Sequence, residues 1–119
     1  MESNQGNDLI NTAPFIAILV DRYIGGTGTS SKDPLVSPLF ASDEDTKKLP
    51  PTWISIAGHD MLRDHGERMA EKLKKAGVEV VAVVHERQQH VMEFMAGRAP
   101  EADDSIARIG EWMRKKVAT

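Results

Sequence analysis

Cysteine is absent from this 119-residue sequence. Its absence excludes disulfide bonds, thiolate metal ligands and a cysteine nucleophile, although it does not fix the compartment in which the protein works. An excess of one charge is also lacking, because 15 basic residues stand against 18 acidic ones and the net charge is −3. No basic face stands out along the chain, so a nucleic-acid partner is not expected.

Long hydrophobic runs are missing as well. The longest strongly apolar stretch of the first half covers residues 14–20, which is far short of the roughly 20 residues that a membrane-spanning helix needs. The polar residues after Met1 do not resemble a signal peptide. A hydrophobic content of 40% with 28% charged residues is typical of a globular chain. The length suffices for one domain at most, and the first twelve residues start without a structural signal, as if cut from a longer chain.

The spacing of apolar residues predicts three main helices and two strands. We expect the helices at 13–24, 61–76 and 100–117, and the strands at 53–57 and 78–84. The first helix is apolar on every side over part of its length, so it should be covered all round. Both strands are nearly continuous in apolar character, which is typical of strands buried on both faces.

The segments between these elements have weaker signals. Residues 34–51 contain four prolines and are expected to be extended, with one short helical turn around 42–48. Residues 85–99 are expected to be mostly loop. The buried stripe of the last helix is predicted to contain Ala102, Ile106, Ile109, Met113 and Val117.

The stretch from Trp53 to Glu93 contains strand, helix and strand in succession. Two strands joined in this way form a parallel crossover unit, which should be right-handed. A two-stranded parallel sheet is not expected to stand alone, because both its faces and its edges need cover. The sequence therefore predicts the end of a larger doubly wound α/β sheet.

Asp60 and His90 each follow one of the predicted strands within a few residues. Functional groups in parallel sheets lie beyond the carboxyl ends of the strands, and adjacent strands put both loops on the same edge. A carboxylate there can accept the imidazole N–H, fix its tautomer and stabilise the imidazolium. Each residue has an ordinary alternative, since Asp60 alone is explained as a helix N-cap and His90 as a loop histidine. The pairing of the two across one crossover unit favours the catalytic interpretation.

Two other kinds of site are not favoured. Residues 26–28 read Gly-Thr-Gly, but they lack the Gly-Lys-Ser/Thr ending of a phosphate loop and no strand precedes them. A mobile connection explains them. The histidines at 59 and 65 have a poor spacing for helical metal ligands and no HExxH motif is present, so no metal site is expected.

The chain resembles the C-terminal part of an α/β-hydrolase of the hormone-sensitive-lipase type, the esterase group with an HGGG oxyanion motif. The resemblance covers nearly all of the sequence from Asn11 onward. The matching residues are Asp33-Pro34, Ser37-Pro38-Leu39-Phe40, Leu49-Pro50-Pro51, residues 60–64 with Gly66, Ala76-Gly77-Val78, and His90. Around the acid, the family pattern Asp-x-Leu-x-Asp-x-Gly is met by Asp60, Leu62, Asp64 and Gly66.

This resemblance implies a fold and an activity. It makes the chain the C-terminal portion of an α/β-hydrolase fold, with the last two parallel strands, their flanking helices and part of the lid region. Residues 1–48 would be a lid-associated helix and connection, and 49–119 the C-terminal part of the catalytic domain. Asp60 matches the acid and His90 the base of a serine carboxylesterase triad, which acts on an ester substrate without a cofactor.

The sequence departs from the family pattern in two respects. The family commonly has Gly and then Phe after the histidine, whereas Val91 follows here and the next aromatic residue is Phe94. The larger departure is that no G-x-S-x-G elbow and no HGGG motif occur anywhere. The serines outside such a context are Ser3, Ser30, Ser31, Ser37, Ser42, Ser55 and Ser105.

Two hypotheses follow from the missing nucleophile. In the first, the chain is a fragment or partner chain of an esterase, inactive alone and completed by the N-terminal portion of the same hydrolase. In the second, it is a non-catalytic interaction module, in which the apolar helix at 13–24 and the open sheet edges form a docking surface and Asp60 is an N-cap only.

Overall fold

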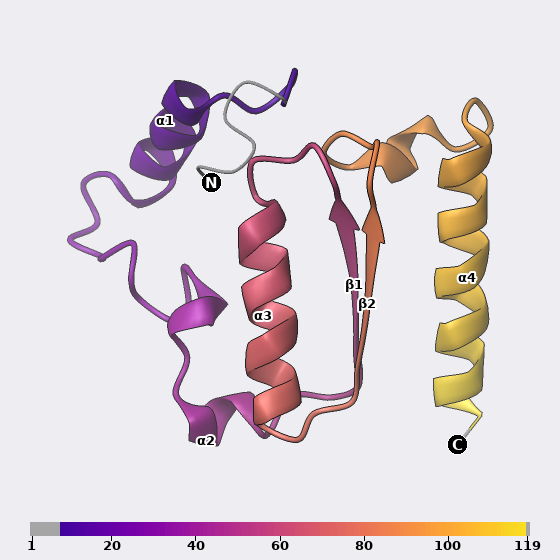
Figure 1. Cartoon of the computed structure of the whole chain (residues 1–119). Coiled ribbons are helices and arrows are strands. Elements are labelled where there is room, and N and C mark those ends of the chain that lie inside the picture. The colour runs from indigo at the N-terminus through magenta and orange to yellow at the C-terminus, as the bar shows by residue number, and fades with distance from the viewer. Residues whose placement is uncertain (1–7, 119) are drawn as a thin grey trace.

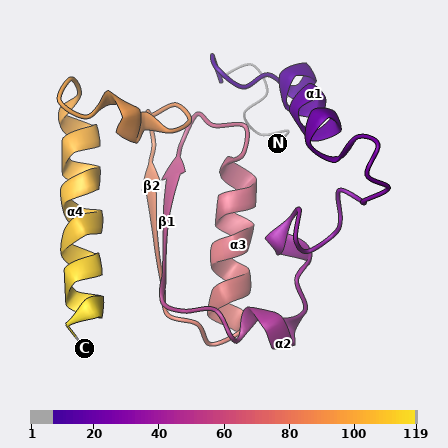
Figure 2. The same cartoon turned by 180° about the vertical axis from the view of Figure 1, so that it is seen from behind.

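The computed structural model describes residues 8–118 as three layers built around a small parallel sheet. The sheet consists of β1 (Thr52–Ala57) and β2 (Val80–His85). Helix α3 (Arg63–Lys75) lies on one side of the sheet and α4 (Pro100–Val117) on the other (Figures 1 and 2). The strand–helix–strand unit predicted from the sequence is therefore present, and its two strands are parallel.

The two strands pair from Thr52 opposite Val80 to Ala57 opposite His85. Each predicted strand is found, with its bounds shifted by one or two residues. The predicted burial on both faces is wrong for residues 8–118, since in β1 only Ile56 and Ala57 are buried and β2 is half-buried or exposed throughout. The reason is that within residues 8–118 the sheet has two strands only, so each strand has a hydrogen-bonded neighbour on one edge and no strand beside its other edge.

The first third of the described chain runs around the outside of this sandwich. Helix α1 (Ala13–Ile24) has the predicted bounds, and the Thr12 hydroxyl oxygen accepts a hydrogen bond from the N–H of Phe15 at its start. Two short helices follow, η1 (Pro38–Phe40) and α2 (Asp43–Thr46). The second lies within the helical turn expected around 42–48, whereas the first was not expected.

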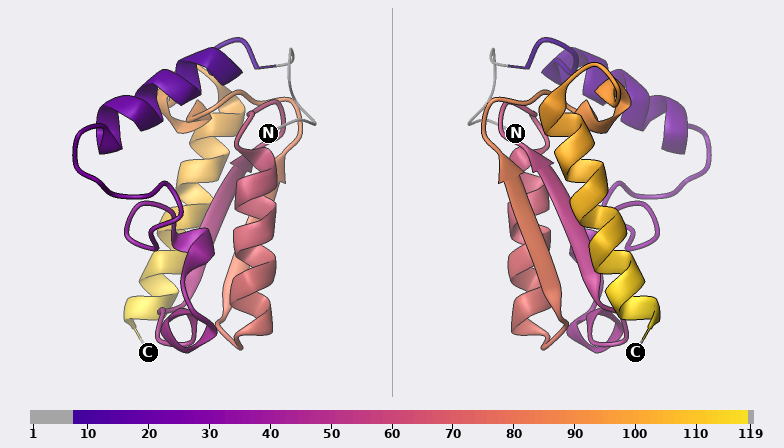
Figure 3. Two further views of the ribbon diagram at one scale, coloured as in Figure 1. Left: turned by 90° about the vertical axis from the view of Figure 1, so that its left-hand side faces the viewer. Right: turned by 90° about the vertical axis from the view of Figure 1, so that its right-hand side faces the viewer.

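Helix α1 lies at the end of the molecule at which both strands terminate, on the same side of the sheet as α3 (Figures 1 and 3). None of its residues is buried, so the all-round cover predicted for it is not supplied by residues 8–118. None of the helices that the structure describes is both long enough and apolar enough to cross a membrane.

Helix α3 begins at Arg63, two residues later than predicted, because residues 57–63 form turns. Ala70 and Leu73 are its buried residues and face the sheet. Gly66 allows this helix to approach β1, since a Cβ there would lie 3.0 Å from Cγ1 of Ile56. The helix-weakening glycine noted in the sequence thus has a packing role.

Helix α4 has the predicted bounds, but only part of the predicted buried stripe is confirmed, since Ala102 is buried and Ile109 half-buried. Its buried residues are Ala102 and Ser105, whereas Ile106, Met113 and Val117 are 45%, 54% and 87% exposed. The small residues let the helix lie close to the loop after β2. Further along, the ring of Trp112 lies 5.9 Å from that of Trp53, centroid to centroid. Ile109 and Met113 of the predicted stripe line a groove beside Trp53 of β1.

A pair of glycine substitutions tests the packing of α3. Gly110 lies inside α4, and a Cβ there would meet nothing within 4 Å. Gly110→Ala should raise the free energy of unfolding by about 0.5–1 kcal/mol through helix propensity. Gly66→Ala should gain clearly less or destabilise, because Ile56 must move. Urea denaturation followed by circular dichroism measures both, and an equal gain at the two positions would contradict the close α3–β1 contact.

Candidate active site

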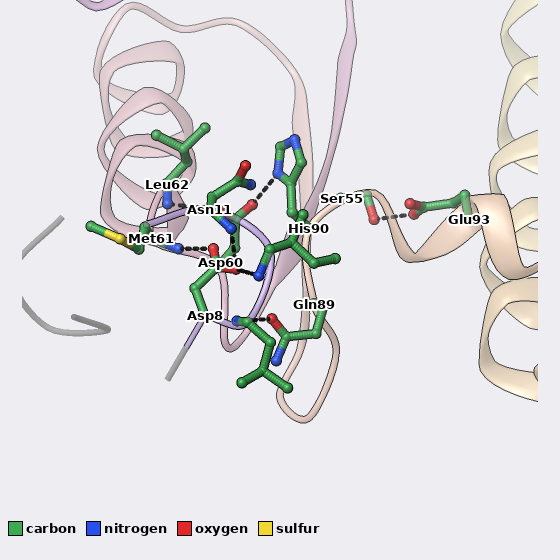
Figure 4. Close-up of polar contacts among 11 residues, drawn as sticks. Asp8, Asn11, Ser55, Asp60, Met61, Leu62, Gln89, His90 and Glu93 are labelled. Carbon is green, nitrogen blue, oxygen red and sulfur yellow. Dashed lines mark hydrogen bonds and ion pairs between the residues drawn. The ribbon is translucent and has the colours of Figure 1, made fainter. Parts of the chain in front are cut away.

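Asp60 and His90 meet at the carboxyl edge of the sheet. Asp60 lies in the turn after β1, and His90 lies in the loop after β2. The Oδ2 atom of Asp60 is 2.6 Å from Nδ1 of His90, although 30 residues separate the two in the sequence (Figure 4). The structure thus brings the two predicted site residues together as a carboxylate–imidazole pair.

The burial of the two side chains is unequal. The Asp60 side chain is 10% exposed and the His90 side chain 36%. The second carboxylate oxygen of Asp60, Oδ1, accepts a hydrogen bond of 2.8 Å from the backbone N–H of Leu62. Asp60 is therefore held from both oxygens, and it begins a turn instead of serving as N-cap of α3, whose N-cap position is Leu62.

The backbone of the two loops makes this meeting possible. Gly58 directly follows β1, and a Cβ at this position would overlap the backbone carbonyl of Glu86. Gly58 and His59 donate backbone hydrogen bonds of 2.8 and 3.0 Å to the carbonyls of His85 and Gln88. Only glycine permits this contact between the loops, and it brings Asp60 within reach of His90.

Arg63 adds a side-chain link between the same loops. Its Nη1 atom lies 3.4 Å from the Gly58 carbonyl oxygen and 3.2 Å from Oε2 of Glu86, and its Nε donates to Glu67 at 2.8 Å. The first turn of α3 is thereby connected to the two loops that contain Asp60 and His90. An arginine suits this role because its guanidinium presents several donors in a fixed plane.

A second carboxylate, Asp8, lies behind the turn that carries Asp60. Asp8 is only 5% exposed. Its Oδ1 accepts hydrogen bonds from the N–H groups of Ile10 and Asn11, both 2.8 Å, and its Oδ2 accepts one of 2.9 Å from the N–H of Met61 (Figure 4). The N-terminal segment is thereby fastened to the residue that follows Asp60.

The electrostatics of Asp8 favour its charged form. Burial alone would raise the pKa of Asp8, but hydrogen bonds from three backbone N–H groups and the nearby charge of His90 hold that pKa below its usual value. The backbone N–H of Asn11 is one of these donors to Asp8, and the Asn11 side chain is drawn with the pair in Figure 4. Its Nδ2 is buried and has no hydrogen-bond partner among residues 8–118.

This arrangement has a definite chemical capacity. With Nδ1 directed to the carboxylate, the imidazole presents Nε2, which has no hydrogen-bond partner within residues 8–118, as the proton-accepting atom. The carboxylate fixes the tautomer and stabilises the imidazolium once a proton is taken. In the same described part of the chain, no group of three or more His, Asp or Glu side chains is arranged to hold a metal ion.

The other residues considered from the sequence are not part of this pair. His65 is exposed on α3, as expected, and His85 is the last residue of β2. Met61 and Met92 are buried and serve packing, whereas Phe94 is 86% exposed. Sequence reasoning missed Asp8 because an isolated aspartate in a polar segment has no periodic or motif signal.

Replacing Asp8 by asparagine tests its link to the site. A carboxamide has one oxygen and places its NH₂ against one of the N–H groups that Asp8 now satisfies, so Asp8→Asn should cost about 1–3 kcal/mol of stability at pH 7. The folded pKa of Asp8 lies below the reference value of 3.8. Its contribution is therefore present above pH 3.8 and is lost as pH falls through the folded pKa, where the difference from wild type should shrink.

Asp33 provides the matched control for that experiment. Its Oδ1 accepts one 2.8 Å hydrogen bond from the N–H of Leu35 in an exposed turn, which an asparagine oxygen can replace. Asp33→Asn should change the free energy of unfolding by less than about 0.5 kcal/mol. Equal losses of unfolding free energy for the two variants in urea denaturation would contradict the link that Asp8 makes between the N-terminal segment and Met61.

Comparison with known proteins places this chain in a family. Residues 1–94 match the sequence profile of the family described as alpha/beta hydrolase fold. An esterase of Acinetobacter venetianus is 32% identical over 80 residues, which are 67% of this chain and 25% of that protein. Neutral cholesterol ester hydrolase 1 of Rattus norvegicus is 46% identical over 70 residues, 59% of this chain and 17% of that protein.

A solved structure agrees with these sequence matches. Brefeldin A esterase, a bacterial homologue of human hormone sensitive lipase, superposes with a TM-score of 0.75 and 34% identity over 86% of this chain and 28% of its own. The chain thus spans about a quarter or less of the two curated relatives. It belongs to the α/β-hydrolase fold family, and the predicted resemblance to its hormone-sensitive-lipase-like esterases is confirmed.

Proposed function

We propose that the chain is the C-terminal part of a serine carboxylic ester hydrolase and supplies the acid and the base of its catalytic triad. The observation that carries this proposal is the 2.6 Å contact between Oδ2 of Asp60 and Nδ1 of His90. Nε2 of His90 takes the proton from a serine hydroxyl as it attacks the ester carbonyl. His90 later returns that proton to the leaving alcohol, while Asp60 holds its tautomer and orientation.

The serine and the oxyanion hole belong to an upstream portion of the hydrolase, on the same polypeptide or on a separate chain. Three features of residues 8–118 support this part of the proposal. β1 is paired on one edge only, and an apolar groove that includes Leu39, Ile54 and Met69 runs beside it. The indole N–H groups of Trp53 and Trp112 are buried and have no partner within the described chain. A further strand on β1 would pair its free edge and cover the groove, and upstream elements would supply acceptors for the two indole N–H groups.

The same proposal divides the chain in two. Residues 1–48 form a lid-associated helix and connection, and residues 49–119 the end of the catalytic domain. The exposure of apolar residues on α1 supports this division, since Ile18 is 56% and Tyr23 73% exposed. Apolar side chains at this density on one helix fit a surface that covers an ester-binding pocket or another part of the hydrolase.

The substrate class proposed is a small carboxylic ester. Two relatives are named for ester hydrolysis, one as an esterase and one as a cholesterol ester hydrolase. The mechanism proposed needs no metal and no organic cofactor, because nucleophile, base and oxyanion donors are all protein groups.

Activity measurements test the proposal. Residues 1–119 alone should not hydrolyse p-nitrophenyl esters, and addition of the upstream portion encoded by the same reading frame should restore turnover. In that assembly His90→Ala should abolish turnover, and Asp60→Asn should lower kcat by about 10³–10⁴-fold because the imidazole loses its correct tautomer.

Lys115→Ala is the control, because Lys115 lies in the last turn of α4 with a side chain that is 71% exposed. Its activity in the assembly should equal that of wild type. Turnover by residues 1–119 alone that depends on His90 would contradict the division of the triad between two portions. An upstream frame without a G-x-S-x-G motif would favour an interaction module over an esterase.

A further inference from the structure

A second polar cluster lies between the histidine loop, β1 and α4. Glu93, three residues after His90, accepts a 2.6 Å hydrogen bond on Oε1 from the hydroxyl of Ser55 in β1. The same oxygen accepts a 3.0 Å hydrogen bond from the hydroxyl of Ser105 in α4. Figure 4 shows Glu93 reaching Ser55 from the side of the loop opposite to Asp60.

This cluster is not a second catalytic triad, although it contains serine, histidine and glutamate. Nε2 of His85 lies 3.5 Å from Oγ of Ser105, but the carboxylate accepts its hydrogen bonds from the two serines. Ser105 is also only 1% exposed, so no substrate reaches its hydroxyl. The geometry is that of a link between three elements.

The segment beside this cluster contains unfavourable backbone. Val91, the residue between His90 and the short helix η2 (Met92–Met95), has φ 54° and ψ 41°. A β-branched residue in the left-handed region costs about 1–3 kcal/mol and persists only where surrounding contacts enforce it. The histidine is therefore attached directly to a strained residue, and the loop needs anchors on its other side.

Glu93 is the side chain that links this segment to the sheet. Met92 is also buried, at 5% exposed, and the N–H of Phe94 donates a 3.0 Å hydrogen bond to the carbonyl of Val91, within the segment itself. Further from His90, the N–H of Gly97 donates a 2.7 Å hydrogen bond to Oδ1 of Asp103 in α4. Glu93 connects it both to β1 and to α4, at a distance of three residues from His90.

We propose that Glu93 is a positioning residue that fixes the strained histidine loop to β1 and α4 and so holds His90 against Asp60. The importance of this positioning for catalysis rests on the proposed function, whereas the positioning itself does not. Burial opposes the charge of Glu93, but hydrogen bonds from Ser55, its own N–H and Ser105, with the nearby charge of His85, hold its pKa below the usual value. The carboxylate is thus charged at neutral pH, the state that accepts both hydroxyl protons most strongly.

Proton NMR of the 119-residue chain measures this positioning without reference to activity. The Nδ1 proton shared by His90 and Asp60 should give a downfield resonance that is absent in Asp60→Asn. In Glu93→Ala this resonance should be lost or should exchange with water at least about tenfold faster, since the loop is released. Glu93→Gln keeps an oxygen that can accept from both hydroxyls and should retain the resonance.

Glu79→Ala is the matched control. Glu79 also binds α4, through a 2.7 Å hydrogen bond from Lys116, but at the opposite end of the sheet. Its removal should leave the His90 resonance unchanged. Should Glu93→Ala fail to fold, Ser55→Ala and Ser105→Ala each remove one of the two donors and should give intermediate exchange rates. An unchanged resonance in Glu93→Ala, or equal loss in Glu79→Ala, overturns the proposal.

Kinetics in the complete hydrolase separate positioning from mere stability. Glu93→Ala should lower kcat by about 10- to 100-fold with little change in KM, because misplacement of the base by about 1 Å affects the chemical step and not ester binding. Glu93→Gln should recover most of the rate. If wild-type assemblies lack activity but the NMR result holds, the proposed function fails and the positioning role of Glu93 stands.

Discussion

The parallel hydrogen bonding between β1 and β2 is the constraint on which the candidate site depends. It runs in register to Ala57 opposite His85, so the two following loops leave the sheet side by side. Gly58 then allows the loops to touch, and Arg63 binds groups on both of them. Asp60 and His90 are the side chains that this arrangement joins. Their contact is a consequence of sheet register, and a slip of the pairing would separate them.

Hydrogen bonds to carboxylates fasten the loops on either side of that pair. Asp60 accepts from Leu62 as well as meeting His90, Asp8 accepts from three backbone N–H groups, and Glu93 accepts from two serines. Removing a carboxylate from water is costly unless such donors replace the lost hydration. Because each of these carboxylates accepts hydrogen bonds, each one fixes the position of the segments from which the donors come. The strained φ of Val91 can then be maintained next to His90.

The described residues leave much apolar surface uncovered. α1 has no buried residue, β1 has one free edge, and the apolar side chains of Ile106, Met113 and Val117 in α4 are exposed. Hydrophobic surface and unpaired strand edges of this kind are unfavourable in water and promote association. They fit a chain that spans about a quarter of the esterase it matches. Packing and catalysis therefore depend on the same upstream elements in the proposed hydrolase.

Local signals in the sequence determined more of the secondary structure than of the packing. α1 and α4 have the predicted bounds because capping residues, prolines and terminal charges act within one turn. The strands and their parallel order followed from two apolar runs around one helix. The Asp60–His90 pair followed as well, since parallel strands end at one edge and the site needs one residue from each loop.

Other features were decided only by the tertiary structure. The buried face of α4 contains Ala102, as predicted, and Ser105, which donates to Glu93, whereas the apolar pattern of the helix also favoured residues that are exposed. Asp8 accepts a hydrogen bond from Met61, which is 53 residues away in the sequence, and Glu93 accepts one from Ser55, which is 38 residues away. No periodicity or motif encodes such contacts, because their formation depends on how distant segments are brought together. The sequence by itself therefore determined the elements and the paired residues, and the tertiary structure decided which carboxylates hold them in place.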